Sequence, residues 1–239
     1  MTHPSIPLHL YSGRLSMFGA KVEIAALEKN IAVTVEMVAF SQAAGYSPKH
    51  AEVLRINPKK QVPVLVHGDV ELFDSTQIFE YFESWQPEPA LWPSSVPDRA
   101  RARLLEHQAD EVYFPQVVRL MGRKTWADDA AAVAAVVAAR DFYQVLEQIL
   151  RARDQGHANH YLAGGFSYAD IGVYMALLFG ARWHVDLTDD TPQLLAWRTR
   201  MGQRPAVRQV VLAMAHYLQS DGMPLPPFMA ALLVPESAT

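Results

Sequence analysis

The sequence contains no cysteine in its 239 residues. This absence excludes disulfide bonds, thiolate metal sites and a cysteine nucleophile. It also disfavours a thiol–disulfide oxidoreductase, since the protein has no thiol with which to form a mixed disulfide. The 9 histidines show neither an HxxxH pattern nor a comparable ligand spacing, so we expect no metal site.

Long apolar runs and a strong charge of one sign are absent as well. No uninterrupted apolar stretch is long enough to span a bilayer, and the first residues, MTHPSIPLHL, lack the basic segment and apolar run of a signal peptide. The formal net charge is -4, and the chain has no long Lys/Arg cluster for binding nucleic acid. We expect a soluble, cytoplasmic protein with neither a membrane nor a nucleic-acid partner.

What is present is enough apolar material for a substantial core. Hydrophobic residues make up 50% of the chain, whose length allows one large domain or two modest ones. Apolar patterns predict a strand, a helix and a strand over residues 8–11, 17–29 and 31–38. Two further runs, 62–66 and 70–73, flank a short turn with Gly68 and predict a hairpin, after which a helix follows. The order βαβ and then ββα is that of a thioredoxin-like α/β domain, which we expect over residues 1–84.

The second part of the chain is predicted to be helical. Residues 85–97 are crowded with proline, which is typical of a linker. Residues 98–122 and 128–153 show long helical patterns, the second of them rich in alanine. We therefore expect an all-α helical domain over residues 98–239.

Proline and capping residues mark where the later helices begin. Ser167 and Asp170 form a capping-box pattern before an almost uncharged segment, which predicts a central, buried helix. Two shorter helices are expected from about Pro192 and Pro205, because proline suits the first turn of a helix.

The hairpin and the helix after it indicate a ligand site. Pro63 has no amide hydrogen and must stand at the mouth of its strand. A cis bond there would turn the N–H and C=O of Val62 outward to receive another peptide. Asp74 and Ser75 stand beside the free N–H groups of the next helix, which suits an anion and the ammonium group of a ligand. A plain helix cap is the alternative for this pair, and the two roles are compatible.

These residues also carry a resemblance to a known family. The motifs, in chain order, are Asn57-Pro58, Gln61-Val62-Pro63-Val64-Leu65 and Asp74-Ser75. They resemble the glutathione-recognition half of cytosolic glutathione transferases of the serine type, tau-like or theta-like. YLAGGFSYADIGVYMAL is similar to the capping-box helix in the helical domain of the same family, so the resemblance covers nearly the whole chain. It implies glutathione as co-substrate, a role in detoxification and a two-fold homodimer.

A glutathione transferase must favour the thiolate of glutathione, because the thiolate is the nucleophile. The donor that stabilises it is expected between the first strand and the first helix, where the helix dipole adds to its effect. Our first choice is Ser16, whose spacing before a Lys-Val pair looks like that of serine-dependent transferases, although Met17 stands where a proline is frequent. A role as helix cap alone is the alternative for Ser16. Ser12 and Tyr11 are the alternative donors, because loop length and the activating residue differ between classes.

The resemblance implies six further contacts to glutathione: Lys60, Gln61, Val62, Pro63, Asp74 and Ser75. It assigns Asp74 to the ammonium group and Ser75 to the carboxylate of the γ-glutamyl unit, while the backbone of Val62 pairs with the cysteinyl unit. Gln61 and Lys60 would reach the glycine end, although Lys60 fits a plain surface loop equally well.

The second substrate is expected to be a small hydrophobic electrophile that lies between the two domains. The candidate contacts are Phe18, Tyr113, Phe114, Val117, Met121 and Trp126, with Arg119 able to meet an anionic group. Aromatic residues at helical spacing belong more often to the core than to a pocket. The sequence therefore indicates the region that binds the second substrate rather than any single contact residue in it. Dehalogenation, ether cleavage, isomerisation and peroxidase chemistry fit the sequence equally, because all of them use an activated glutathione thiol.

The leading hypothesis is thus a glutathione transferase in which Ser16 stabilises the thiolate. The alternative is a non-catalytic protein of the same fold that serves as a binding or assembly module, because fold does not establish function. The completeness of the predicted glutathione contacts favours the enzyme.

Overall fold

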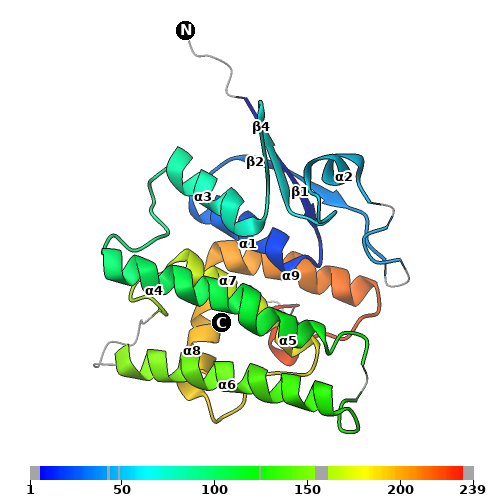
Figure 1. The fold of residues 1–239 in the computed structure, drawn as a ribbon, viewed down its shortest axis with the longest axis vertical. Helices are drawn as coiled ribbons and strands as arrows, with labels where there is room; N and C mark the ends of the chain where they lie inside the picture. Colours follow the sequence, from blue (N-terminus) through cyan, green and yellow to red (C-terminus); the bar gives the residue numbers. More distant parts are fainter. Residues whose placement is uncertain (1–5, 42–43, 48, 124, 154–160, 234–239) are drawn as a thin grey trace, which may run out of the picture.

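The computed structural model describes residues 6–41, 44–47, 49–123, 125–153 and 161–233 (Figure 1). Its first part contains a mixed sheet with the strand order β2-β1-β3-β4. The strands are β1 (Leu8–Gly13), β2 (Val33–Val38), β3 (Val64–His67) and β4 (Val70–Phe73). β1 is parallel to β2 and antiparallel to β3, which is antiparallel to β4. The thioredoxin-like α/β fold expected from the sequence is confirmed.

The strand ends differ from the predicted ones. β1 continues to Gly13 and includes Ser12, which was expected in the following loop, because both residues pair with β2. β2 begins at Val33, two residues later than its apolar run. β3 begins only at Val64, since Pro63 has no N–H to contribute to a ladder.

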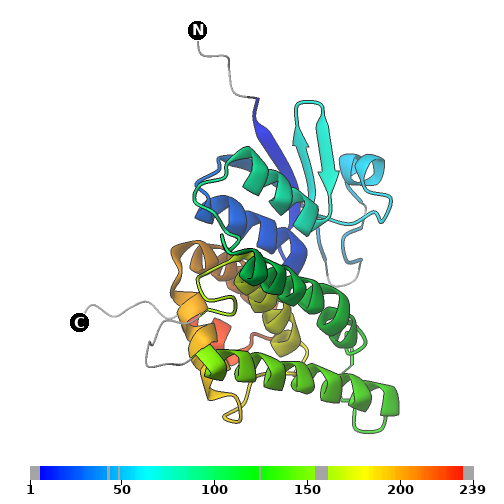
Figure 2. The ribbon, with the colours of Figure 1, turned by 60° about the vertical axis from the view of Figure 1, so that its left-hand side comes forward.

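Helices cover both faces of the sheet (Figure 2). α1 (Met17–Glu28) and α3 (Ser75–Trp85) lie side by side on one face, and α2 (Ala51–Ile56) lies on the other. Fully buried apolar side chains fill the space between the sheet and the α1–α3 pair, among them Leu10, Val22, Leu65 and Ile78.

The rest of the described chain is helical, as the sequence predicts. Its longer helices are α4 (Val96–His107), α6 (Ala130–Arg153), α7 (Tyr168–Arg182), α8 (Pro192–Gln203) and α9 (Pro205–Ser220). Shorter elements are α5 (Phe114–Val118), α10 (Pro227–Ala230) and the 3-10 turn η2 (Ala231–Leu233). α7 is buried over 168–181, which makes it the centre of this part. Within the described ranges, no helix has the length and apolar character needed to cross a membrane.

The first helical stretch is interrupted. The pattern over residues 98–122 predicts one continuous helix, but α4 ends at His107 and passes through a π-helical turn, η1 (Gln108–Tyr113), into the short α5. Pro115 lies in the first turn of α5. It has no N–H to donate to the carbonyl four residues earlier, so the regular hydrogen-bond ladder is broken there.

A buried lysine joins the two parts of the chain. Lys21 on α1 is 1% exposed, and its ammonium group donates hydrogen bonds of 2.6 Å to Glu106 and to Asp110. The hydroxyl of Thr76 on α3 donates to the same Glu106 carboxylate. Because a buried ion is tolerated only with partners, these bonds hold α1 and α3 against α4 and η1.

α7 begins with the capping box that the sequence predicts. The Asp170 carboxylate is fully buried and accepts hydrogen bonds from the backbone N–H and the hydroxyl of Ser167. It also accepts the backbone N–H of Leu162 and the indole N–H of Trp197. One carboxylate therefore satisfies buried donors from three segments of the helical part.

Asp170→Ala should lower the free energy of unfolding by about 3 kcal/mol or more, because it leaves the buried N–H groups of Leu162 and Trp197 without acceptors. Urea unfolding followed by circular dichroism measures this loss. The matched control is Asp141→Ala at an exposed position of α6, which should change stability by no more than about 0.5 kcal/mol. Similar losses in both variants would contradict the role given to Asp170.

Candidate active site

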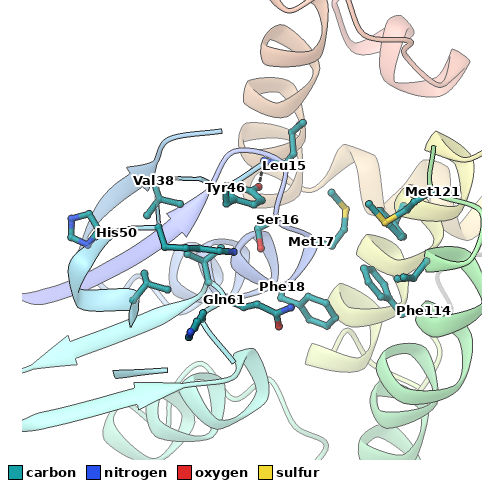
Figure 3. Close-up of a pocket in the computed structure, with 16 residues that line it drawn as sticks. Leu15, Ser16, Met17, Phe18, Val38, Tyr46, His50, Gln61, Phe114 and Met121 are labelled. Carbon is teal, nitrogen blue, oxygen red and sulfur yellow. Dashed lines mark hydrogen bonds between the residues drawn. The ribbon is translucent and has the colours of Figure 1, made fainter. Parts of the chain in front are cut away.

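A cleft of about 340 Å³ opens between the two parts of the chain. Its walls come from the start of α1, the segments around α2 and before β3, and the side of α5 and α7 that faces them. Figure 3 shows Ser16 between Tyr46 and Phe18, with Phe114 and Met121 on the helical side. Residues far apart in the sequence therefore share one space.

Ser16 borders this cleft as the N-cap of α1. Its side chain is nearly buried, and its hydroxyl oxygen accepts the backbone N–H of Gly19 at 3.0 Å. Among the described residues the hydroxyl donates to no group, so its proton is available to a ligand. The N-terminus of α1 adds the positive end of the helix dipole at the same point. The arrangement suits an anion in the cleft.

The two alternative hydroxyls lie elsewhere. Ser12 is fully buried and donates a hydrogen bond of 2.6 Å to the carboxyl group of Glu23, whose pKa is raised by burial. Tyr11 packs between the rings of His9 and His50, with centroid distances of 4.6 and 4.7 Å. Neither Ser12 nor Tyr11 borders the cleft.

A polar recess of about 90 Å³ adjoins the cleft. Five of the six residues expected to contact glutathione line it: Gln61, Val62, Pro63, Asp74 and Ser75. The sixth, Lys60, borders the neighbouring cleft. The Val62–Pro63 peptide bond is cis, and the backbone of Val62 has no hydrogen-bond partner in the part of the chain that the structure describes. A backbone donor and acceptor are thus open to a peptide ligand.

Asp74 has a rare backbone conformation at the edge of this recess. Its φ of 77° lies in a region that residues other than glycine seldom adopt. Its carboxylate accepts the N–H groups of Thr76 and Gln77 as the N-cap of α3. The carbonyl of Ser75, the next residue, is held by the hydroxyl of Tyr168 on α7. Residues in such conformations cluster at ligand sites, where the surrounding contacts maintain them.

Three of the six residues expected at the hydrophobic site line the cleft: Phe18, Phe114 and Met121. The rings of Phe18 and Phe114 are 4.7 Å apart. Phe114 also stacks on Phe179 of α7 at 4.4 Å. The three rings form one apolar wall of the cleft, and Phe18 also borders the polar recess.

The other residues expected there do not border the cleft. Tyr113 and Val117 are buried in the helical core, Trp126 packs against His184, and Arg119 is exposed. Two faces alternate along this segment: Phe114, Val118 and Met121 line the cleft, whereas Tyr113, Val117 and Leu120 are buried in the core. Both faces are apolar, so the sequence pattern alone does not tell which of them meets the cleft.

Tyr46, Met17 and Phe179 line the cleft although the sequence did not single them out as contacts. Tyr46 lies in an irregular segment that has no periodic pattern to reveal its direction. Phe179 lies in α7, where every neighbouring side chain is apolar and a cleft-facing residue looks like core. Met17 is the one of these three that the sequence could have indicated, because it directly follows Ser16.

Two acidic residues of the helical part, Asp110 and Glu111, line the recess. Burial raises the pKa of Asp110 to about 7, although the charge of Lys21 opposes the shift. Burial also acts on Glu106, but the charge and hydrogen bond of Lys21 and the hydroxyl of Thr76 outweigh it, so the pKa of Glu106 lies below its ordinary value. Asp110 therefore titrates near neutral pH while Glu106 stays charged. In the described residues, no group of three or more acidic or histidine side chains could hold a metal ion.

The fold and the cleft define a two-domain protein in which a thioredoxin-like sheet and a helical domain enclose one site. Family models agree with this class: the glutathione S-transferase N-terminal domain matches residues 6–84, and the glutathione S-transferase C-terminal domain matches residues 120–212. The chain belongs to the glutathione S-transferase family, as the sequence predicts.

Individual relatives support the same assignment. The chain is 30% identical over 161 residues to glutathione S-transferase 1 of Dianthus caryophyllus, an alignment that covers 66% of this chain and 69% of that protein. It is 28% identical over 222 residues to glutathione S-transferase 2 of Saccharomyces cerevisiae, covering 84% and 88% of the two chains. Its fold is similar to that of the Tau class glutathione S-transferase from mango, Mangifera indica, with a TM-score of 0.74, 22% identity and coverage of 91% and 100%.

The raised pKa of Asp110 predicts that the stability of the protein depends on pH. Its pKa in the folded protein, about 7, is above the ordinary value of 3.8, so the folded protein binds more protons than the unfolded chain between these values. The contribution of this group to the free energy of unfolding therefore falls as the pH rises through that window. Urea unfolding at about pH 5 and about pH 8 measures the difference.

Asp110→Asn cannot ionise and should lose less stability than the wild type over the same pH interval. Asp141→Asn, at an exposed position, should follow the wild type. If Asp110→Asn lost as much stability as the wild type, the titrating group would have to be another one.

Proposed function

We propose that this protein is a glutathione-dependent transferase in which Ser16 stabilises the glutathione thiolate for attack on a small hydrophobic electrophile. The observation that carries the proposal is the hydroxyl of Ser16, which borders the cleft at the N-terminus of α1 with its oxygen bonded by Gly19 and its proton unused. Lowering a thiol pKa by about two units requires about 3 kcal/mol. A hydrogen bond to a charged group contributes roughly 1.5–3 kcal/mol, and the helix N-terminus adds to it.

In this proposal glutathione lies with its γ-glutamyl end in the polar recess. Asp74 binds the ammonium group, and the hydroxyl and backbone N–H of Ser75, at the start of α3, bind the carboxylate. The backbone of Val62 pairs with the cysteinyl unit, and Gln61 and Lys60 bind the glycine end. The arrangement is supported by the shared lining of the recess and the cleft, which lets one elongated tripeptide pass from Asp74 to Ser16.

The electrophile binds against the apolar wall of the cleft. Phe18, Phe114 and Phe179 supply aromatic surface, and Met17 and Met121 add side chains that adapt to different shapes. These contacts support a largely apolar second substrate that meets the sulfur between the two domains.

The proposal divides the chain by role and assigns it a cytoplasmic location. Residues 1–84 bind glutathione, residues 85–97 link the domains, and residues 98–239 contribute the electrophile site.

We also propose a homodimer, which is supported by large apolar side chains that are exposed on α4, η1 and α6. The helices α4 and α6 both lie on the near face of the molecule in Figure 1. The exposed side chains are Leu104, Val112, Val133, Val137 and Val145.

Ser16→Ala should raise the pKa of the bound glutathione thiol towards the free value of about 8.5, because it removes the proposed donor. Titration of the thiolate absorbance of bound glutathione with pH measures this shift. Turnover of an aryl chloride with glutathione should fall about 100-fold or more, the usual cost of losing one donor to a developing anion.

Ser12→Ala and Tyr11→Phe are the matched controls and should leave the thiol pKa unchanged, because neither hydroxyl borders the cleft. A depressed thiol pKa that persists in Ser16→Ala would move the role to another donor. Failure of the wild type to bind glutathione would favour the binding or assembly module instead.

Light scattering at micromolar concentration should give twice the chain mass of 26.7 kDa. Replacing Leu104 and Val137 together by Glu should shift the protein to a monomer, because an interface core does not accommodate unpaired charges. Leu54→Glu, at an exposed apolar position of α2, is the control and should remain dimeric. A monomeric wild type, or a double variant that remains dimeric, would count against this interface.

A further inference from the structure

The polar recess beside the cleft has walls from both parts of the chain. Asp74 and Ser75 come from the start of α3, and Asp110 comes from η1. The side chain of Asp110 is 13% exposed, and it lines the recess although it belongs to the helical part. The recess volume of about 90 Å³ is roughly the share of three water molecules. A charged group in so small a space lies near both carboxyl groups.

Asp74 by itself does not satisfy an ammonium group. Its Oδ1 atom already accepts the N–H groups of Thr76 and Gln77 at 3.1 and 3.3 Å. Its Oδ2 atom has no partner in the described part of the chain. An ammonium group carries three N–H donors, so it needs further acceptors. Asp110 is placed to supply one, because the bond from Lys21 uses only part of the capacity of a carboxylate.

The wall that carries Asp110 has fewer positive charges than carboxyl groups. Lys21 donates to Glu106 and to Asp110 at 2.6 Å each, so one buried cation faces two carboxyl groups. Like charges in a buried site repel, which disfavours the ionisation of both groups. Burial raises the pKa of Asp110 to about 7, so at that pH half of the free protein keeps a proton there. An ammonium group in the recess would take the place of this proton.

We propose that Asp110 and Asp74 together bind the amino group of the γ-glutamyl unit, and that Asp110 releases its proton when this ammonium group arrives. The proton passes to solvent, while the ammonium group of the ligand keeps its own three. The inference rests on the proposed function, because it places glutathione in the recess. It implies that the site selects γ-glutamyl compounds with a free amino group over N-acylated ones. It also makes the helical part a direct contributor to glutathione binding.

The groups around Asp110 decide whether a pH effect can be assigned to it. The charged and titratable groups that face it are Lys21, Tyr168, Glu106, Asp74, Glu111 and Lys59. Burial lowers the pKa of Lys21, but the facing acidic groups outweigh it, so the pKa rises. Burial raises the pKa of the Tyr168 phenol. Lys21 and Glu106 therefore stay charged and Tyr168 stays neutral near pH 7. A variant of Asp110 leaves the other groups in place and isolates its contribution.

The sign of the pH effect follows from the charge of the ligand. A nearby ammonium group favours the ionised carboxylate, so the pKa of Asp110 should fall from about 7 by roughly 1–3 in the complex. The complex then binds fewer protons than the free protein. The affinity for the ligand therefore rises as the pH rises through this window.

The test is isothermal titration calorimetry with S-methylglutathione, which has no thiol proton to lose. Binding enthalpies at pH 7 in phosphate and in Tris give the number of protons released, because the two buffers differ in ionisation enthalpy. We expect about half a proton per ligand for the wild type and none for Asp110→Asn. The wild-type affinity should rise about tenfold from about pH 5.5 to about pH 8, and that of the variant by less than about threefold.

The internal control is the analogue of S-methylglutathione that lacks the amino group of its γ-glutamyl unit. The wild type should bind this analogue without releasing a proton, and Asp110→Asn should bind it as tightly as the wild type does. The two ligands can be compared on the wild type alone, so the test does not depend on the folding of a variant. Asp141→Asn, at an exposed position of α6, should match the wild type with both ligands.

Four outcomes would contradict the expectation. Proton release that is the same for both ligands, or that persists in Asp110→Asn, would overturn the inference in favour of another titrating group. An equal loss of affinity for both ligands in Asp110→Asn would overturn it in favour of a structural role at the domain contact. Binding of S-methylglutathione to the wild type without proton release would refute this inference alone. Failure of the wild type to bind S-methylglutathione would refute the proposed function itself.

Discussion

The geometry of the site depends on one buried ion. Lys21 lies on α1, the helix whose first turn carries Ser16, and its ammonium group is bonded at 2.6 Å by carboxylates of α4 and η1. Opening the domain contact would break both of these charged hydrogen bonds, which are stronger in the buried contact than they would be in water. The distance between the Ser16 hydroxyl and the helical wall is therefore set by an interaction that resists separation of the domains. The Tyr168 hydroxyl, bonded to the Ser75 carbonyl, fixes the start of α3 against α7 in the same way.

This contact also separates polar from apolar surface at the site. The recess has an open backbone at Val62 and a helix start at Asp74, whereas the helical wall offers aromatic rings such as Phe114. A charged peptide and an apolar electrophile can thus be held next to each other without either one losing its preferred surroundings. Ser16 and Tyr46 lie where the two surfaces meet. In the proposed function, the sulfur of glutathione and the reacting carbon come together at this place.

How far the sequence predicts the site depends on whether a residue is positioned by its neighbours in the chain. Pro63 and Asp74 could be placed because proline and helix-capping chemistry act over a few residues. Tyr113 could not be, because it and Phe114 are adjacent aromatic residues and only the packing of the helical part decides which of the two faces the cleft. Tyr46 carried no local signal at all, since its position follows from packing over Gly13 and against Phe40.

By itself the sequence determined the order of the elements, the two-part architecture and the family, because periodicity, capping and proline act locally and leave readable patterns. It also selected three hydroxyls as candidate donors, those of Tyr11 at the end of the predicted first strand and of Ser12 and Ser16 in the loop after it. Only the tertiary structure separated them: Ser12 is turned inward to Glu23, Tyr11 packs between histidine rings, and Ser16 faces the cleft. That separation required the domain contact, because a cleft exists only where surfaces distant in the sequence are brought face to face.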